Sequence, residues 1–206
     1  MGRLSENLVN PYHGFAILVG AAFIAAVLWP EGGAAALAAL MRGPFLYHTV
    51  ALLVGFLGLQ IGEAERGYGV QVGLRRGLRL AGLVGIGLAL VLPFLLIHRV
   101  ETGLPWPGFA AMVGFLVLYG LFWALVGYGL GAVVPWEGLR FALKYGGLLV
   151  VTLVPALGGL PVSPFPTVEG IWRGSVAGWG GLILYGGLDL GALGVWQWAS
   201  KRSWRG

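Results

Sequence analysis

The charged residues of this chain are concentrated between Gly62 and Gly82, in the stretch GEAERGYGVQVGLRRGLRLAG. This stretch holds four of the 13 basic residues and two of the eight acidic residues. Arginine and glutamate side chains at this spacing can form ion pairs, and arginines also bind anionic lipid headgroups. Val70, Leu74 and Leu78 recur every four residues, so they share one face of a helix. The stretch predicts an amphipathic helix that lies on a membrane surface or docks into a partner protein, unless its arginines only fix membrane orientation.

One acidic residue, Asp189, lies deep inside an apolar segment, within YGGLDLGALG. An ionisable group at membrane depth is costly to bury, so Asp189 is a candidate for lining a transport pathway or for pairing with an arginine of a neighbouring helix. Tyr119, Trp123 and Tyr128 recur at roughly helical spacing in another segment. These three aromatic residues are further candidates for the pathway, and helix packing is the alternative role.

Two histidines are the candidates for holding a cofactor. His48 and His98 fall near corresponding ends of two neighbouring apolar segments, and two histidines at similar depth can be the axial ligands of a b-type haem. The alternative is that they hydrogen-bond to loops at the membrane interface. The chain has no cysteine, no HExxH motif and no GxxxxGKS/T loop. The sequence therefore predicts no metal site, no catalytic residues and no nucleotide site in this chain.

The composition is that of a membrane protein. Hydrophobic residues make up 58% of the 206 residues and charged residues only 10%, whereas soluble domains carry about 25% charged residues. There are 38 glycines, and several pairs have the GxxxG spacing that lets membrane helices approach closely. These pairs are Gly58–Gly62, Gly127–Gly131, Gly174–Gly178 and Gly187–Gly191. We interpret them as a sign of tight helix packing rather than of particular contacts.

Six apolar segments are long enough to cross a bilayer as helices, which takes about 20 residues each. They cover residues 12–29, 44–62, 79–97, 108–134, 143–161 and 175–198. The sequence therefore predicts an all-α integral membrane protein with six transmembrane helices, in a single transmembrane domain over residues 1–206.

The orientation of these spans follows from the distribution of lysine and arginine. With the N-terminus inside, 10 of the 13 basic residues fall on the inner side and three on the outer side. This bias predicts cytoplasmic N- and C-termini, a location in the cell inner (cytoplasmic) membrane, and a cytoplasmic position for residues 63–79. The basic residues flank apolar segments rather than forming a run, so no nucleic-acid partner is expected.

The order of these features resembles the permease subunits of ATP-binding-cassette (ABC) transporters of the type-2 exporter class. The second span ends in GLQIGEAERGYG, where Glu63, Glu65, Arg66 and Gly67 are similar to the family's Glu-x-Glu-Arg-x-Gly-like element. RRGLRLAG then leads into the third span, and a short turn, VPWEGLRF, joins a long fourth span to the fifth. A proline-rich stretch, GGLPVSPFPTVEGIW, precedes the sixth span, where the family carries short re-entrant helices.

This resemblance implies a cytoplasmic coupling helix over about residues 64–78, seated in a separate cytoplasmic ATPase that holds the ATP and Mg²⁺. It also implies a second permease chain, identical or related, and transport rather than catalysis by this chain. The residues implied in ATPase coupling are Glu63, Glu65, Arg66, Gly67, Val70, Leu74, Arg75, Arg76, Leu78 and Arg79. The alternative function is a small membrane-anchor subunit of a larger respiratory complex, with or without haem at His48 and His98.

Overall fold

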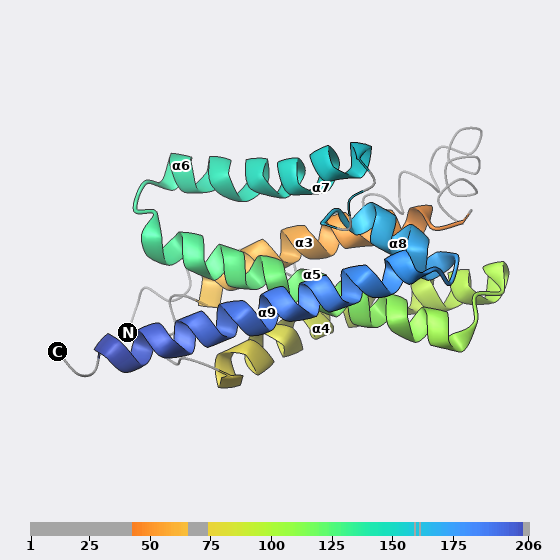
Figure 1. Ribbon diagram of the computed structural model, residues 1–206, viewed down its shortest axis with the longest axis horizontal. Helices are drawn as coiled ribbons and strands as arrows, with labels where there is room; N and C mark the ends of the chain where they lie inside the picture. Colours follow the sequence, from red (N-terminus) through yellow and green to blue (C-terminus); the bar gives the residue numbers. More distant parts are fainter. Residues whose placement is uncertain (1–42, 66–73, 159, 161, 204–206) are drawn as a thin grey trace.

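The computed structural model describes residues 43–65, 74–158, 160 and 162–203, and all regular secondary structure among them is helical. Four long helices lie along the molecule: α3 (Phe45–Glu65), α4 (Leu74–Thr102), α5 (Trp106–Val133) and α9 (Val176–Ser203) (Figure 1). A further rod consists of α6 (Glu137–Phe141), the π-helical turn η2 (Ala142–Gly146) and α7 (Gly147–Leu157). The short helix α8 (Pro164–Trp172) lies between this rod and α9 in the chain.

The bundle has two ends, because α3, α4, α5 and the rod run alternately in opposite directions (Figure 1). We call one of them the Glu63 end; there α3 finishes, α4 begins, α5 finishes and α6 begins. The opposite end, where α4 is followed by α5 and where α8 lies, is called the Trp172 end. α5 is the central helix, since it packs against α3, α4, α8 and α9.

Four of the described elements are long and apolar enough to cross a membrane: Phe45–Glu65, Leu74–Thr102, Trp106–Val133 and Glu137–Leu157. They confirm the predictions of a helical fold and of a membrane protein with transmembrane helices. α9 has 28 residues and therefore extends about 42 Å, but it is not among these four elements. The expected first span, residues 12–29, lies outside the described residues.

α3, α4, α5 and the rod correspond to the second to fifth predicted spans, with shifted ends, and α9 covers the residues predicted for the sixth. α4 begins at Leu74 rather than at residue 79, so residues 74–78, which the sequence places in the coupling helix, continue directly into the third span. The fifth span begins at Glu137 rather than at residue 143. An acidic residue in the first turn interacts favourably with the helix dipole. The ends differ because hydropathy marks only the apolar part of a helix, whereas hydrogen bonding continues through its charged turns.

α8 has clear signals for its start and its end. The hydroxyl of Ser163 caps the helix by accepting a hydrogen bond from the backbone N–H two residues later, at 3.3 Å, and Pro164 occupies the first helical position. After the helix, Gly174 has a φ of 65°, a left-handed conformation that favours glycine. A Cβ added to Gly178 would lie 2.4 Å from the backbone of α8, so α8 and α9 pack closely. A short helix thus occupies the position where the resemblance implies re-entrant helices.

α3 and α5 are packed backbone against backbone. A Cβ added to Gly58 would lie 2.3 Å from the carbonyl oxygen of Gly120, and one added to Gly62 would lie 1.9 Å from that of Ala124. A Cβ added to Gly127 would lie 2.4 Å from a carbonyl oxygen of α3. Real Cβ atoms essentially never come within 3.0 Å of such atoms. Only glycine therefore fits at these positions, and the helix contact depends on it.

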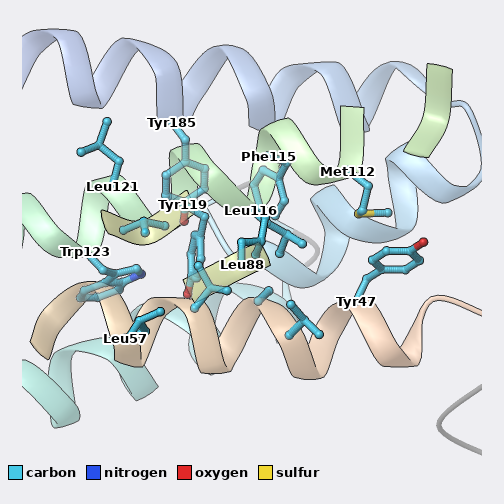
Figure 2. Close-up of a cluster of buried hydrophobic side chains, with 14 of the residues drawn as sticks. Tyr47, Leu57, Leu88, Met112, Phe115, Leu116, Tyr119, Leu121, Trp123 and Tyr185 are labelled. Carbon is cyan, nitrogen blue, oxygen red and sulfur yellow. The ribbon is translucent and has the colours of Figure 1, made fainter. Parts of the chain in front are cut away.

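The buried core lies between α5 and its neighbours, with aromatic side chains at its centre (Figure 2). The Tyr185 ring of α9 contacts Phe115, Tyr119 and Phe122 of α5, with ring centroids 5.7, 5.2 and 5.4 Å apart. These contacts are edge-to-face, the arrangement that the ring quadrupoles favour. The Tyr185 hydroxyl donates a hydrogen bond to the carbonyl oxygen of Val162, which ties α9 to the chain just before α8.

The α3–α5 contact predicts a strong effect of one added methyl group. Gly62→Ala places a Cβ 1.9 Å from the carbonyl oxygen of Ala124, so the helices must separate. We expect the free energy of unfolding to fall by about 1–3 kcal/mol, the usual cost of overpacking, measured by thermal or denaturant unfolding in mild detergent.

The control for this experiment is Gly114→Ala, also on α5. A Cβ on Gly114 meets nothing within 4 Å in the described part of the chain. This variant should be as stable as the wild type, or more stable by up to about 1 kcal/mol, because alanine favours helix. Equal losses from both substitutions would contradict the close-packing interpretation.

Candidate functional site

Glu63, in the last turn of α3, binds two cations of the α6–η2–α7 rod. One carboxylate oxygen accepts from Nε of Arg140 at 2.8 Å, and the other accepts from Nζ of Lys144. The Lys144 side chain is only 5% exposed, whereas that of Glu63 is 29% exposed. Because a buried ammonium group is costly without a partner, Lys144 depends on Glu63. The two ion pairs hold the start of the rod against the end of α3.

Glu65 and Arg76 connect the start of α4 to the neighbouring helices. The Glu65 carboxylate accepts from Arg79 through both oxygens, at 2.9 and 3.1 Å. The buried Arg76 guanidinium donates to the hydroxyl of Tyr128 on α5, and its Cζ lies 4.4 Å from the centroid of that ring. The first turns of α4 are therefore joined to α3 by an ion pair and to α5 by a hydrogen bond with a cation–π contact.

The π-helical turn η2 adds a second connection between the rod and α3. Gln60 donates to the hydroxyl of Tyr145, and Phe56 stacks on the Tyr145 ring with centroids 4.5 Å apart. Tyr145 follows Lys144 directly, so two consecutive residues of the turn both contact α3. Single π-helical turns inside α-helices occur frequently at functional sites.

The predicted coupling residues lie on both sides of the segment 66–73. Glu63 and Glu65 end α3, and the first two turns of α4 hold Leu74, Arg75, Arg76, Leu78 and Arg79. Leu74 and Leu78 are 64% and 65% exposed, and Arg75 is exposed. Arg66, Gly67 and Val70 lie outside the described residues. The structure thus places the described members of the set at the Glu63 end.

We call the ion pairs of Glu63 and Glu65, with the Arg76–Tyr128 and Gln60–Tyr145 contacts, the Glu63-end network. It joins α3, α4, α5 and the rod within one layer of side chains. The end of α3 and the start of α4, which flank residues 66–73 in the chain, both take part in this network. Charged and hydrogen-bonded contacts of this kind can be exchanged between two helix arrangements, whereas close apolar packing resists such exchange.

Arg140, Lys144 and Gln60 were not among the site residues predicted from the sequence. The structure brings all three to the Glu63-end network. The spacing of four residues between Arg140 and Lys144 was a usable signal, because it places both cations on one helix face. Nothing in the sequence indicated that their shared partner would be Glu63.

The four predicted pathway residues lie in three different surroundings. Tyr128 belongs to the Glu63-end network through Arg76. Tyr119 and Trp123 are buried in the core, where the Tyr119 hydroxyl lies 3.1 Å from Oγ1 of Thr152 on α7. Asp189 is 3% exposed, and neither of its carboxyl oxygens has a hydrogen-bond partner among the described residues.

Both candidate haem histidines contact aromatic residues of α8. Nε2 of His48 lies 3.3 Å from the backbone oxygen of Phe165. His98 is fully buried, and its ring centroid lies 5.1 Å from that of Tyr47 and 5.6 Å from that of Trp172. Packing at the Trp172 end thus accounts for the buried His98 ring, and the half-buried His48 contacts the backbone of α8 rather than a loop.

Comparison with known protein families, with curated proteins and with solved structures finds no match to this chain. Within the described residues, no group of three or more His, Cys, Asp or Glu side chains could hold a metal ion. The Glu63-end network and the isolated Asp189 carboxyl group are therefore the features on which a function can be argued.

Removal of the Glu63 charge should destabilise the protein, because Lys144 then remains buried without its counterion. For Glu63→Gln we expect a loss of about 3 kcal/mol in unfolding free energy, at the low end for buried pairs because Glu63 is partly exposed. The measurement is denaturant unfolding of the purified full-length chain. Glu63→Gln combined with Lys144→Met should lose less than Glu63→Gln alone, since the buried ammonium group is then removed together with its counterion.

Glu169→Gln is the matched control. Glu169 also pairs with an arginine, Arg173, four residues along α8, but the two side chains are 46% and 70% exposed. An exposed pair of this kind contributes about 0.5 kcal/mol or less. If Glu63→Gln proves no more destabilising than this control, the network is not a structural connection.

Proposed function

We propose that this chain is the permease subunit of an ATP-driven exporter of the ABC type-2 class. It forms the membrane pathway with a second permease chain and is driven by a separate cytoplasmic ATPase, which supplies the ATP and Mg²⁺ site. The observation that supports this best is the Glu63-end network. The described members of the set that the family resemblance implies in coupling stand at the junction of three helices and the rod, on both sides of residues 66–73 in the chain.

The exposed apolar side chains at the start of α4 support a docking role for this region. Leu74 and Leu78 are spaced four residues apart on one face and have 64% and 65% of their surface exposed. Glu65 and Arg79 lie beside them as an ion pair. Apolar side chains with a charged rim suit an amphipathic helix that fits into a groove of a partner. In this proposal, closure of the ATPase moves residues 66–73 and, through the network, α3, α4 and the rod.

The order of helices is also compatible with the resemblance. A short turn precedes the rod, and the short helix α8 stands before α9, as the family layout implies. The full proposal has six spans, cytoplasmic termini and a location in the cytoplasmic membrane. Asp189 and Tyr119 are the candidate pathway residues between α5 and α9. The alternative, a membrane-anchor subunit of a respiratory complex, is an outcome of the tests below.

The orientation can be tested with single cysteines, because the chain contains none. Glu101 is exposed at the Trp172 end, and Glu137 is exposed at the Glu63 end. A membrane-impermeant thiol reagent should label Glu101→Cys in intact cells, after removal of any outer membrane. It should label Glu137→Cys only after the membrane is opened. The reverse pattern would place the Glu63 end outside and rule out coupling to a cytoplasmic ATPase.

The partner can be tested by purifying the tagged chain in mild detergent from its own host, with mass spectrometry and an ATP-hydrolysis assay of what accompanies it. We expect an ATPase with a P-loop to accompany the native chain. The double variant Leu74→Asp/Leu78→Asp should lose this partner, because it places charge on the docking face.

The matched control carries Ile97→Asp and Val100→Asp, two exposed apolar positions at the other end of α4. It should keep the ATPase. Redox subunits in place of an ATPase, with a haem absorption band in the Soret region, would favour the membrane-anchor function instead. An ATPase that stays bound to the Leu74/Leu78 variant would show that coupling occurs elsewhere.

A further inference from the structure

Asp189 is a buried acidic side chain without a partner among the described residues. It is 3% exposed, and neither carboxyl oxygen accepts a hydrogen bond. It lies near the middle of α9, far from either end of the helix. A carboxyl group in such a place needs a donor or a positive charge, because desolvating it alone is costly. Asp189 is thus a buried acidic group whose interaction partner is not among the described residues.

The neighbouring hydroxyl groups are already used. Tyr185 precedes Asp189 by four residues on the same face of α9, and its hydroxyl donates to the carbonyl oxygen of Val162. On α5, the hydroxyl of Tyr119 is hydrogen-bonded to Thr152. The rings of these tyrosines are close to the carboxyl-bearing face, but their hydroxyl groups are turned to other partners.

The basic groups of the helices packed against α9 are turned to other partners or are exposed. α5 contains no charged residue, and Arg173, at the end of α8, pairs with Glu169. Of the four arginines of α4, three contact Glu65, Tyr128 and Trp106, and the fourth, Arg75, is exposed. No cation within the described part of the chain therefore neutralises this carboxyl group.

Aromatic rings of α5 pack around Tyr185, which lies four residues before Asp189 on this face of α9. Phe122 of α5 lies 5.4 Å from Tyr185 and 5.3 Å from Trp123, measured between ring centroids, and Tyr119 lies 5.2 Å from Tyr185. Organic cations bind to the faces of aromatic rings, and a nearby carboxylate adds a counter-charge. A metal ion such as Ca²⁺ needs several oxygen ligands, and the described residues offer no such group.

The packing beside Asp189 is loose on the side of Gly186. Gly186 lies three residues before Asp189 on an adjoining face of α9. A Cβ added there would meet only a methyl carbon of Leu118, at 3.9 Å. A small separation of α9 from α5 at this glycine would bring the carboxyl group and the aromatic rings to a common opening. Such a separation is of the kind that a transport cycle requires.

We propose that Asp189, with the rings of Tyr185 and Phe122, is the recognition site for a hydrophobic organic cation. The cationic centre pairs with the Asp189 carboxylate, and the apolar body of the molecule contacts the rings between α5 and α9. This inference deepens the proposed function and rests on it for transport, because it assigns cationic amphiphiles as the substrate class of the exporter. Binding itself can be measured on the chain alone.

The test compares two probes of the same shape and opposite charge, tetraphenylphosphonium and tetraphenylborate. Equilibrium dialysis with the purified full-length chain in detergent gives the Kd of each. We expect the phosphonium to bind more tightly than the borate. Asp189→Asn should weaken phosphonium binding by about tenfold or more, because the buried counter-charge is lost while the side-chain shape is kept.

Glu169→Gln is the matched control, since it removes one negative charge from the exposed end of α8 and should leave phosphonium binding unchanged. If Asp189→Asn fails to fold, Phe122→Leu serves in its place. It keeps an apolar side chain and removes one aromatic face, so phosphonium binding should weaken by about threefold. Unchanged phosphonium binding in Asp189→Asn, or equal binding of the two probes by the wild type, would overturn the proposal.

The outcome is separable from that of the proposed function. Asp189 lies in the bundle, away from Leu74 and Leu78, so co-purification of the ATPase should be the same for Asp189→Asn and for the wild type. If an ATPase co-purifies but phosphonium does not bind, the exporter function stands and cationic amphiphiles are ruled out as its substrate class. If phosphonium binds with charge selectivity but no ATPase co-purifies, the cation site stands and the exporter function is ruled out.

Discussion

The backbone contact between α3 and α5 determines how the other described elements are placed. Helices in a bilayer gain little from excluding water, so their association depends on dispersion contacts and on close approach. Gly58 and Gly62 on α3 and Gly127 on α5 permit an approach that any Cβ would prevent. α4 and α9 then pack against other faces of α5, and the aromatic core lies between α5 and its neighbours. A separation of α3 from α5 would therefore disturb every later layer of the bundle.

This contact also fixes the register in which the polar side chains meet. A Cβ on Gly62 would lie 2.7 Å from the backbone nitrogen of Tyr128, so the end of α3 and the last turns of α5 are level. At that level Tyr128 receives Arg76 of α4, and one residue beyond Gly62 the carboxylate of Glu63 binds Lys144. The Glu63-end network thus follows from the glycine contact. A shift of one helical turn between α3 and α5 would separate these partners by about 5.4 Å.

The α6–η2–α7 rod is attached differently from the other helices. At the Glu63 end it is held by the ion pairs of Glu63 and by the Gln60–Tyr145 hydrogen bond. Farther along the rod, the Thr152 side chain contacts the Tyr119 hydroxyl, and the Thr152 carbonyl oxygen accepts a hydrogen bond from the Ser163 hydroxyl. These polar attachments lie at separate points along the rod, and the buried Leu148 of α7 adds an apolar contact with the core. In the proposed transport cycle, the ion pairs of Glu63 would make the rod move together with α3.

The sequence by itself determined the helical class, the membrane environment and the approximate positions of five apolar segments that the structure describes. These follow from local properties, namely hydropathy over about 20 residues and the absence of strand-like alternation. The tertiary structure decided which glycines are contacts: Gly58 and Gly62 touch α5, whereas Gly187 and Gly191, at the same spacing, have no atom within 4 Å in the described part of the chain. It also decided that Glu63 pairs with Lys144, 81 residues away, and that Asp189 has no described partner. Pairing across such separations depends on helix register, which no local pattern in one sequence encodes.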